Sequence, residues 1–129
     1  MAYQVEYQEK IGYLYAHVQG KRTQNSVIEL IKDVSERAIE LHQKRVLVDV
    51  RDFEGWLQIM ESKYVVTSEF PKLRGKGLRK AAILDREPLE PNRWFFFETV
   101  AQNRGFDLRI FNDQKSALNW LLEGVDLEK

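Results

Sequence analysis

The sequence predicts one α/β domain over residues 1–129, with the element order β-β-α-β-α-β-α-β-α, a mixed and mostly parallel sheet, and helices mainly on one face. Three observations predict it. A chain of 129 residues suits one domain and is too short for two ordinary ones. Its opening segment alternates between apolar and polar residues, which indicates strands. Beyond it, helical patterns alternate with short apolar segments, which is typical of a parallel sheet.

The first two strands are expected to form a hairpin. Tyr3, Val5 and Tyr7 alternate with polar residues in the first strand, and the second covers 13–18 and ends at Gly20. The polar segment between them suits a turn.

An amphipathic helix is expected next. Thr23 suits its N-cap, because the hydroxyl can accept a hydrogen bond from an otherwise unpaired backbone N–H. Asp33 and Arg37 stand at the favourable i,i+4 spacing on its polar side. The apolar residues at helical spacing are Val27, Leu30, Ile31, Val34, Ala38 and Leu41.

Residues 44–51 are expected to form the third strand, and residues 56–70 a second helix that Pro71 ends or kinks. This helix is expected to be anchored by Trp56, Ile59, Met60 and Tyr64.

The remaining elements are a short strand at 80–85, a third helix, a strand at 106–111 and a final helix. Pro91 suits the first turn of the third helix, and Gly105 its C-terminal cap. The final helix is expected to be capped by Asn112 or Asp113 and to carry Ala117, Leu118, Trp120 and Leu121.

The third strand predicts how the sheet is covered. Strands covered on both faces are nearly continuous apolar runs. Here three valines alternate with Leu47, Asp49 and Arg51. One face is therefore expected to be wet, with the helices mainly on the other.

Three segments carry a resemblance to a known family: VLVDVRDFEG at 46–55, AAILD at 81–85 and LRIFNDQKSALNWL at 108–121. With the element order, they resemble the STAS-like fold in its SpoIIAA-like branch, named for bacterial anti-sigma-factor antagonists. The resemblance covers nearly the whole chain, but its motifs are mostly structural, and one fold hosts many activities.

The resemblance also shows a departure. Members of that branch carry a phosphorylatable serine in the turn after the third strand, whereas the matching residues 52–56 contain no hydroxyl. A phosphorylation switch is therefore not expected here. Glu54 either imitates the modified state or is a carboxylate favoured by the dipole at the start of a helix.

Composition excludes several classes of protein. The 20 basic and 20 acidic side chains balance, so no global field attracts nucleic acid. The chain has no cysteine, no apolar run long enough to span a membrane and no N-terminal signal-peptide pattern. A cytoplasmic protein without integral membrane association is expected.

Catalytic signals are weak. His17 and His42 lack metal-ligand spacing, and neither a nucleophile elbow nor a phosphate-binding glycine loop is present. Asp49 with Asp52 forms an acidic pair, as does Asp85 with Glu87, but such pairs are common on charged surfaces. The expectation is a non-enzyme without cofactor or metal.

Apolar side chains are in excess. Trp94, Phe95, Phe96 and Phe97 are consecutive, so they cannot all face one core. The segment 56–66 is likewise apolar around most of a helix. Three interpretations stay open: a tightly packed core, a homodimer interface, or a ligand cleft between the second and third helices.

For the ligand interpretation, cationic side chains from the loop at 72–80 would hold an anionic end, unless that loop is only a solvated connection. The candidate residues for a small, apolar-anionic, lipid-like ligand are Trp56, Met60, Tyr64, Trp94 and Phe95 for its apolar part and Lys72, Arg74 and Lys76 for its charged end.

A candidate partner surface comprises Tyr13, Tyr15 and His17, on the side of their strand expected to be wet. The alternative is cross-strand pairing with Tyr3 and Tyr7. The leading hypothesis is a non-enzymatic regulatory or binding module that contacts a protein partner or the ligand above. The alternatives are a structural homodimer and an uncharacterised hydrolase.

Overall fold

The computed structural model describes residues 3–73, 75–86 and 92–125, without the side chains of 92–94. Over these residues the predicted element order is confirmed. The elements are β1 (Tyr3–Lys10), β2 (Tyr13–Lys21), α1 (Gln24–Glu40), β3 (Arg45–Glu54), α2 (Ile59–Glu69), the 3-10 turn η1 (Phe70–Leu73), β4 (Lys80–Leu84), α3 (Asn92–Asn103), β5 (Leu108–Phe111) and α4 (Gln114–Leu121).

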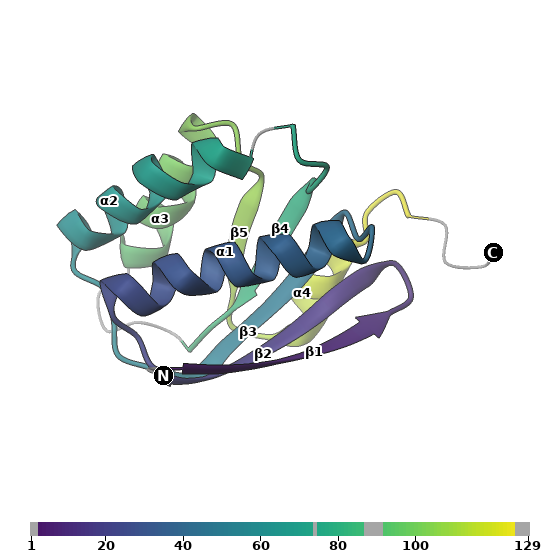
Figure 1. The fold of residues 1–129 in the computed structure, drawn as a ribbon, viewed down its shortest axis with the longest axis horizontal. Helices are drawn as coiled ribbons and strands as arrows, with labels where there is room; N and C mark the ends of the chain where they lie inside the picture. Colours follow the sequence, from purple (N-terminus) through teal and green to yellow (C-terminus); the bar gives the residue numbers. More distant parts are fainter. Residues whose placement is uncertain (1–2, 74, 87–91, 126–129) are drawn as a thin grey trace.

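The sheet has the strand order β1-β2-β3-β4-β5, in which only the β1–β2 pair is antiparallel. Each helix from α1 to α3 therefore connects two neighbouring parallel strands. Such connections are right-handed in almost all proteins, so three in the same direction place their helices on one face (Figure 1). The predicted fold class, with helices mainly on one face, is confirmed.

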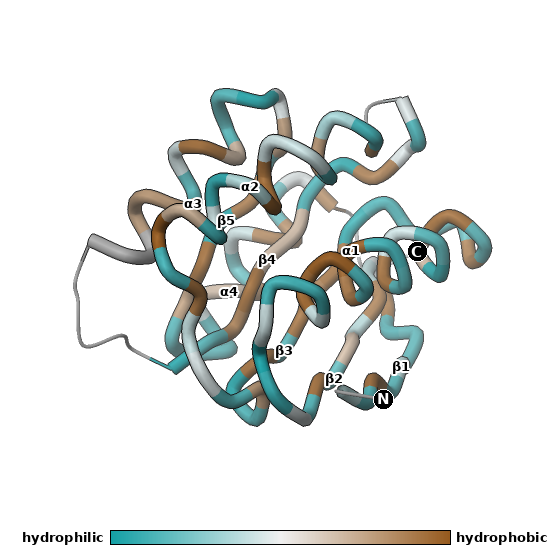
Figure 2. The backbone as a smooth tube through the Cα atoms, turned by 60° about the vertical axis from the view of Figure 1, so that its left-hand side comes forward, coloured by the Kyte–Doolittle hydropathy of each residue, from teal (hydrophilic) through white to brown (hydrophobic). Residues whose placement is uncertain are grey.

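Helix α1 begins as its sequence predicts. The Thr23 hydroxyl accepts a hydrogen bond from the Ser26 backbone N–H at 3.1 Å. Figure 2 shows hydrophobic and hydrophilic segments alternating along α1, and its inward residues Leu30 and Val34 are buried. Its polar side also holds β1, since the Tyr7 hydroxyl donates to Asp33 at 2.7 Å.

Helix α4 covers the opposite face over β3, β4 and β5. It follows the last strand and makes no crossover, so the handedness rule does not place it. Ala117 and Leu121 pack there on Leu47 and Leu84. The expectation that Leu47 lies on a wet face is therefore wrong: α4 buries it completely.

The prediction for the second helix is wrong in its start and its orientation. Helix α2 begins at Ile59, and η1, which contains Pro71, follows it directly. Of the expected anchors on it, Ile59, Met60 and Tyr64 are exposed, Met60 by 75%. The residues that face inward share a stripe at helical spacing and are Ser62, Val65, Val66 and Glu69.

Phe95 and Phe97, from the run of four aromatic residues at 94–97, face different sides of α3, as their helical spacing requires. Phe95 is 68% exposed, whereas Phe97 packs against the core between the sheet and the helices. Two sequence predictions, the Trp94 side chain and Pro91 in the first turn of α3, lie outside the described residues. Asp113 caps α4 by accepting from the Ser116 N–H at 2.8 Å.

The orientation of α2 predicts a contrast between two substitutions. Val66→Ala removes buried methyl groups and is expected to lower the free energy of unfolding by about 2 kcal/mol. Met60→Ala is expected to change it by less than about 0.5 kcal/mol, because the side chain is in water. Urea denaturation measures both variants. Equal losses, or a larger loss for Met60→Ala, would contradict this orientation.

Candidate functional site

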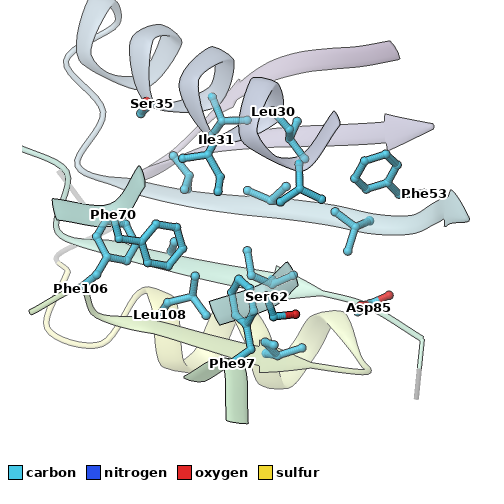
Figure 3. Close-up of a pocket in the computed structure, with 18 of the residues that line it drawn as sticks. Leu30, Ile31, Ser35, Phe53, Ser62, Phe70, Asp85, Phe97, Phe106 and Leu108 are labelled. Atoms are coloured by element: carbon cyan, nitrogen blue, oxygen red, sulfur yellow. The ribbon is translucent and has the colours of Figure 1, made fainter. Parts of the chain in front are cut away.

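A cavity of about 150 Å³ lies between the helix-covered face of the sheet and α1, α2 and α3 (Figure 3). The sheet side is formed by apolar side chains of β3, β4 and β5, among them the short Val48 and Ala81 and the longer Leu108. Leu30 and Ile31 of α1 and Phe97 of α3 form part of the opposite wall. The short side chains of Val48 and Ala81 leave part of the space below the three helices unfilled, and the cavity surface is mostly apolar.

The cavity ends in an ion pair between Arg22 and Asp85. Nη1 of Arg22 lies 2.8 Å from Oδ2 of Asp85, and Nη2 lies 3.1 Å from Oδ1. The two side chains are only 10% and 4% exposed. This bidentate geometry, shielded from water, holds the guanidinium in one orientation.

Arg22 also joins the loops that follow three parallel strands. It follows β2, its Nη2 donates to the carbonyl oxygens of Val50 and Phe53 at the end of β3, and Asp85 follows β4. The guanidinium also lies over the rings of Phe53 and Trp56, at 5.3 and 5.0 Å from their centres. This end of the cavity therefore lies at the carboxyl edge of the strands, where open α/β sheets bind ligands.

The sequence patterns predict only an acidic pair of Asp85 with Glu87, which lies outside the described residues, and they give no role to Arg22. Arg22 and Asp85 are 63 positions apart, and no motif connects them. One signal was available, since each is a charged residue directly after a strand, and the carboxyl ends of parallel strands meet at one edge.

Of the residues predicted to hold the apolar part of a ligand, only some lie at the cavity. Trp56 lines the cavity. Met60, Tyr64 and Phe95 are exposed and do not line it, because their stretches of α2 and α3 face water. The expected cleft between the second and third helices is instead a space below all three helices. Arg74 and the Trp94 side chain lie outside the described residues.

Leu73 and Leu78 of the loop at 72–80 line the cavity, but the described cationic side chains of this loop do not. Lys72 pairs with Glu69 at 3.3 Å, and Lys76 is exposed. Lys80 donates to the carbonyl oxygen of Trp120 at 3.0 Å and lies over its ring. Part of this charge therefore has partners within the chain.

The candidate partner surface divides into two parts. Tyr13 is buried under α4, so it is not available for contact. Tyr15 and His17 are half-buried and reach carboxylates on β3: the Tyr15 hydroxyl donates to Asp49 at 2.8 Å, and His17 Nε2 lies 2.7 Å from Oδ2 of Asp52.

The alternative of cross-strand pairing with Tyr3 and Tyr7 is wrong. Both of those side chains lie on the other face of the sheet, where their hydroxyls donate to Asp33. Tyr15 faces the opposite side and packs with the core under α4.

Asp49 and Asp52 do not form a free pair of carboxylates. Burial alone would raise the pKa of Asp49, but hydrogen bonds from Arg51 and Tyr15 outweigh it and hold the pKa below its usual value. Burial, followed by the hydrogen bond to Asp49, raises the pKa of Tyr15 to about 12. Asp49 is therefore an ionised carboxylate held by Arg51 and Tyr15, and this arrangement does not suit a general acid or base.

Glu54 is not at the start of a helix. It is the last residue of β3, and its carbonyl oxygen accepts from the backbone N–H of Arg22. The carboxylate in the first turn of α2 is that of Glu61, which accepts from the Gln58 N–H at 2.9 Å.

Within the described residues, no helix is both long and apolar enough to cross a membrane. The same part of the chain brings together no group of three or more side chains of the types that bind metals.

A family model described as SpoIIAA-like matches residues 13–122. The fold is also similar to an uncharacterised protein with a SpoIIAA-like fold from Shewanella loihica, at 16% identity and a TM-score of 0.54 over 93% of each chain. An anti-sigma factor antagonist from Mycobacterium paratuberculosis is similar at 12% identity and a TM-score of 0.55, over 92% of this chain and 93% of the other. At these identities the likeness shows the fold alone. No curated protein matches the sequence.

The buried ion pair of Arg22 and Asp85 predicts different losses of stability for two substitutions. Asp85→Ala leaves the Arg22 charge buried without its carboxylate and is expected to cost about 3 kcal/mol of unfolding free energy. Asp52→Ala removes an exposed partner of His17 and is expected to cost less than about 1 kcal/mol. Chemical denaturation at pH 7 measures both. If Asp85→Ala were no more destabilising than Asp52→Ala, the pair would not hold this edge together.

Proposed function

The chain belongs to the SpoIIAA-like family, and on that premise we propose that it is a non-enzymatic binding module whose cavity takes up a small apolar molecule. The cavity below α1, α2 and α3 is the observation that carries this proposal. In another protein, an engineered apolar cavity of about this volume stays dry and binds benzene.

The cost of an empty cavity supports the proposal. At about 24 cal/mol per Å³, an enclosed void of this volume would lower stability by at most roughly 3 to 4 kcal/mol compared with a filled core, and the cost is smaller where the cavity opens to solvent. One larger side chain, at Ala81 for example, would fill part of it. Ligand uptake offers a reason for the protein to keep the space, because a fitting molecule restores the missing contacts.

The charges at the cavity suggest an uncharged ligand. Among the described lining residues, Arg22 is the only cation, and Asp85 compensates its charge. A buried anion without a free partner would be expensive. The anionic end predicted for Lys72 and Lys76 would have to lie outside the cavity, and that role stays a prediction.

Ligand uptake is tested by thermal unfolding in the presence of toluene. A concentration ten times the dissociation constant is expected to raise the unfolding midpoint by about 5 °C. Ala81→Leu places a larger side chain into the cavity and is expected to abolish the shift while the fold is retained. Propanediol, which is small but polar, serves as the control additive. An unchanged midpoint for the wild-type protein, or an equal shift in Ala81→Leu, would contradict the proposal.

A second candidate function is contact with a protein through the exposed apolar side chains of α2 and α3. Ile59, Met60, Tyr64 and Phe95 are all more than half exposed, and aromatic residues and methionine are enriched in protein interfaces. The similarity to an anti-sigma factor antagonist agrees with a regulatory contact. A second copy of the chain is the partner that is simplest to test.

Sedimentation equilibrium at high micromolar concentration distinguishes these possibilities. If these side chains form a homodimer, Met60→Lys and Phe95→Lys are expected to weaken association at least tenfold, because each buries a charge in the interface. Ile11→Lys, which changes an exposed apolar residue in the β1–β2 turn, is the control. A monomeric wild-type protein would remove the homodimer.

A further inference from the structure

Ser62 places a hydroxyl on the cavity wall that has no partner among the described residues. It lies on the inward side of α2, is only 7% exposed and lines the cavity. Its backbone N–H donates to the Gln58 carbonyl oxygen, as in any helix. Its hydroxyl makes no hydrogen bond to any group in the described part of the chain. Figure 3 shows the oxygen directed toward the Asp85 end of the cavity.

Two other helix hydroxyls, those of Ser35 and Thr67, donate to backbone carbonyl oxygens of the preceding turn. Ser35, which also lines the cavity, donates to the Lys32 carbonyl oxygen at 3.1 Å. Thr67 donates to that of Lys63 at 2.8 Å. Buried hydroxyls without a partner are uncommon, and each requires an explanation.

The neighbouring charged groups already have their partners. Arg22 donates to Asp85 through Nη1 and Nη2 and to Phe53 through Nε and Nη2. Asp85 also accepts from the backbone N–H of Arg86. Among the described residues, a ligand that enters the cavity therefore meets at this end the Ser62 hydroxyl, a neutral group without a partner, beside an ion pair whose charges compensate each other.

We propose that Ser62 selects ligands that carry one neutral hydrogen-bonding group, such as a phenol, an alcohol or a ketone, over hydrocarbons of the same shape. This inference rests on the proposed uptake of apolar molecules. The ring or chain of the ligand fills the apolar space, and its polar group pairs with the hydroxyl. A hydrocarbon leaves that buried hydroxyl unpaired, and binding sites that hydrogen-bond a polar ligand group discriminate against ligands that lack the group.

Phenol and toluene form a suitable pair of probes, because they differ by a hydroxyl in place of a methyl group. Isothermal titration calorimetry gives the ratio of their dissociation constants for the wild-type protein and for Ser62→Ala. The comparison of the two ratios cancels the different hydration of the free ligands. Ser62→Ala is expected to shift the ratio about tenfold toward toluene, which corresponds to about 1.4 kcal/mol.

Ser35→Ala is the matched control, because it removes a cavity hydroxyl that already has a partner. It is expected to leave the ratio unchanged. If both probes bind the wild-type protein and Ser62→Ala does not change their ratio, the role of Ser62 is overturned while the uptake of apolar molecules stands. If neither probe binds, the proposed function fails, and this inference fails with it.

Discussion

The structure depends on a constraint of connectivity: three successive crossovers join neighbouring parallel strands in the same direction along the sheet. Right-handed connections then place α1, α2 and α3 on one face. The inward side chains of the strands below these helices include the short Val46, Val48 and Ala81, and the layer between sheet and helices is incompletely filled. The cavity is thus a consequence of the topology combined with short side chains.

Arg22 connects this topology to the site. One guanidinium bonds the carbonyl oxygens at the end of β3 and the carboxylate that follows β4, while its own backbone continues from β2. The side chain of Arg22 thereby connects the carboxyl ends of β2, β3 and β4. The described residues contain no cysteine and no group of three or more side chains that could bind a metal. The same contacts compensate the charge of Arg22, so the proposed ligand is uncharged.

The order of the helices and strands and the helix caps could be predicted from neighbouring residues. Which side of an element faces the core depends on packing against distant parts of the chain and was predicted less well. Thr23 and Asp113 cap helices as expected, because capping needs only neighbouring residues. Helix α2 is apolar on most sides, so its pattern could not show that Val66 faces inward and Met60 outward. The burial of Tyr13 depends on α4, about a hundred residues later, which lies on the sheet face that the handedness rule does not assign.

Strand β1 is an edge of the sheet, paired only with β2 over the described residues. An edge strand of eight residues offers a template for strand addition by another molecule. Its solvent-facing side chains include Glu6, Glu9 and Lys10, and charges in such positions oppose edge-to-edge aggregation. At the other edge, β5 has only four residues, too few for a long ladder. The sheet is thereby discouraged from growing into a continuous intermolecular ribbon.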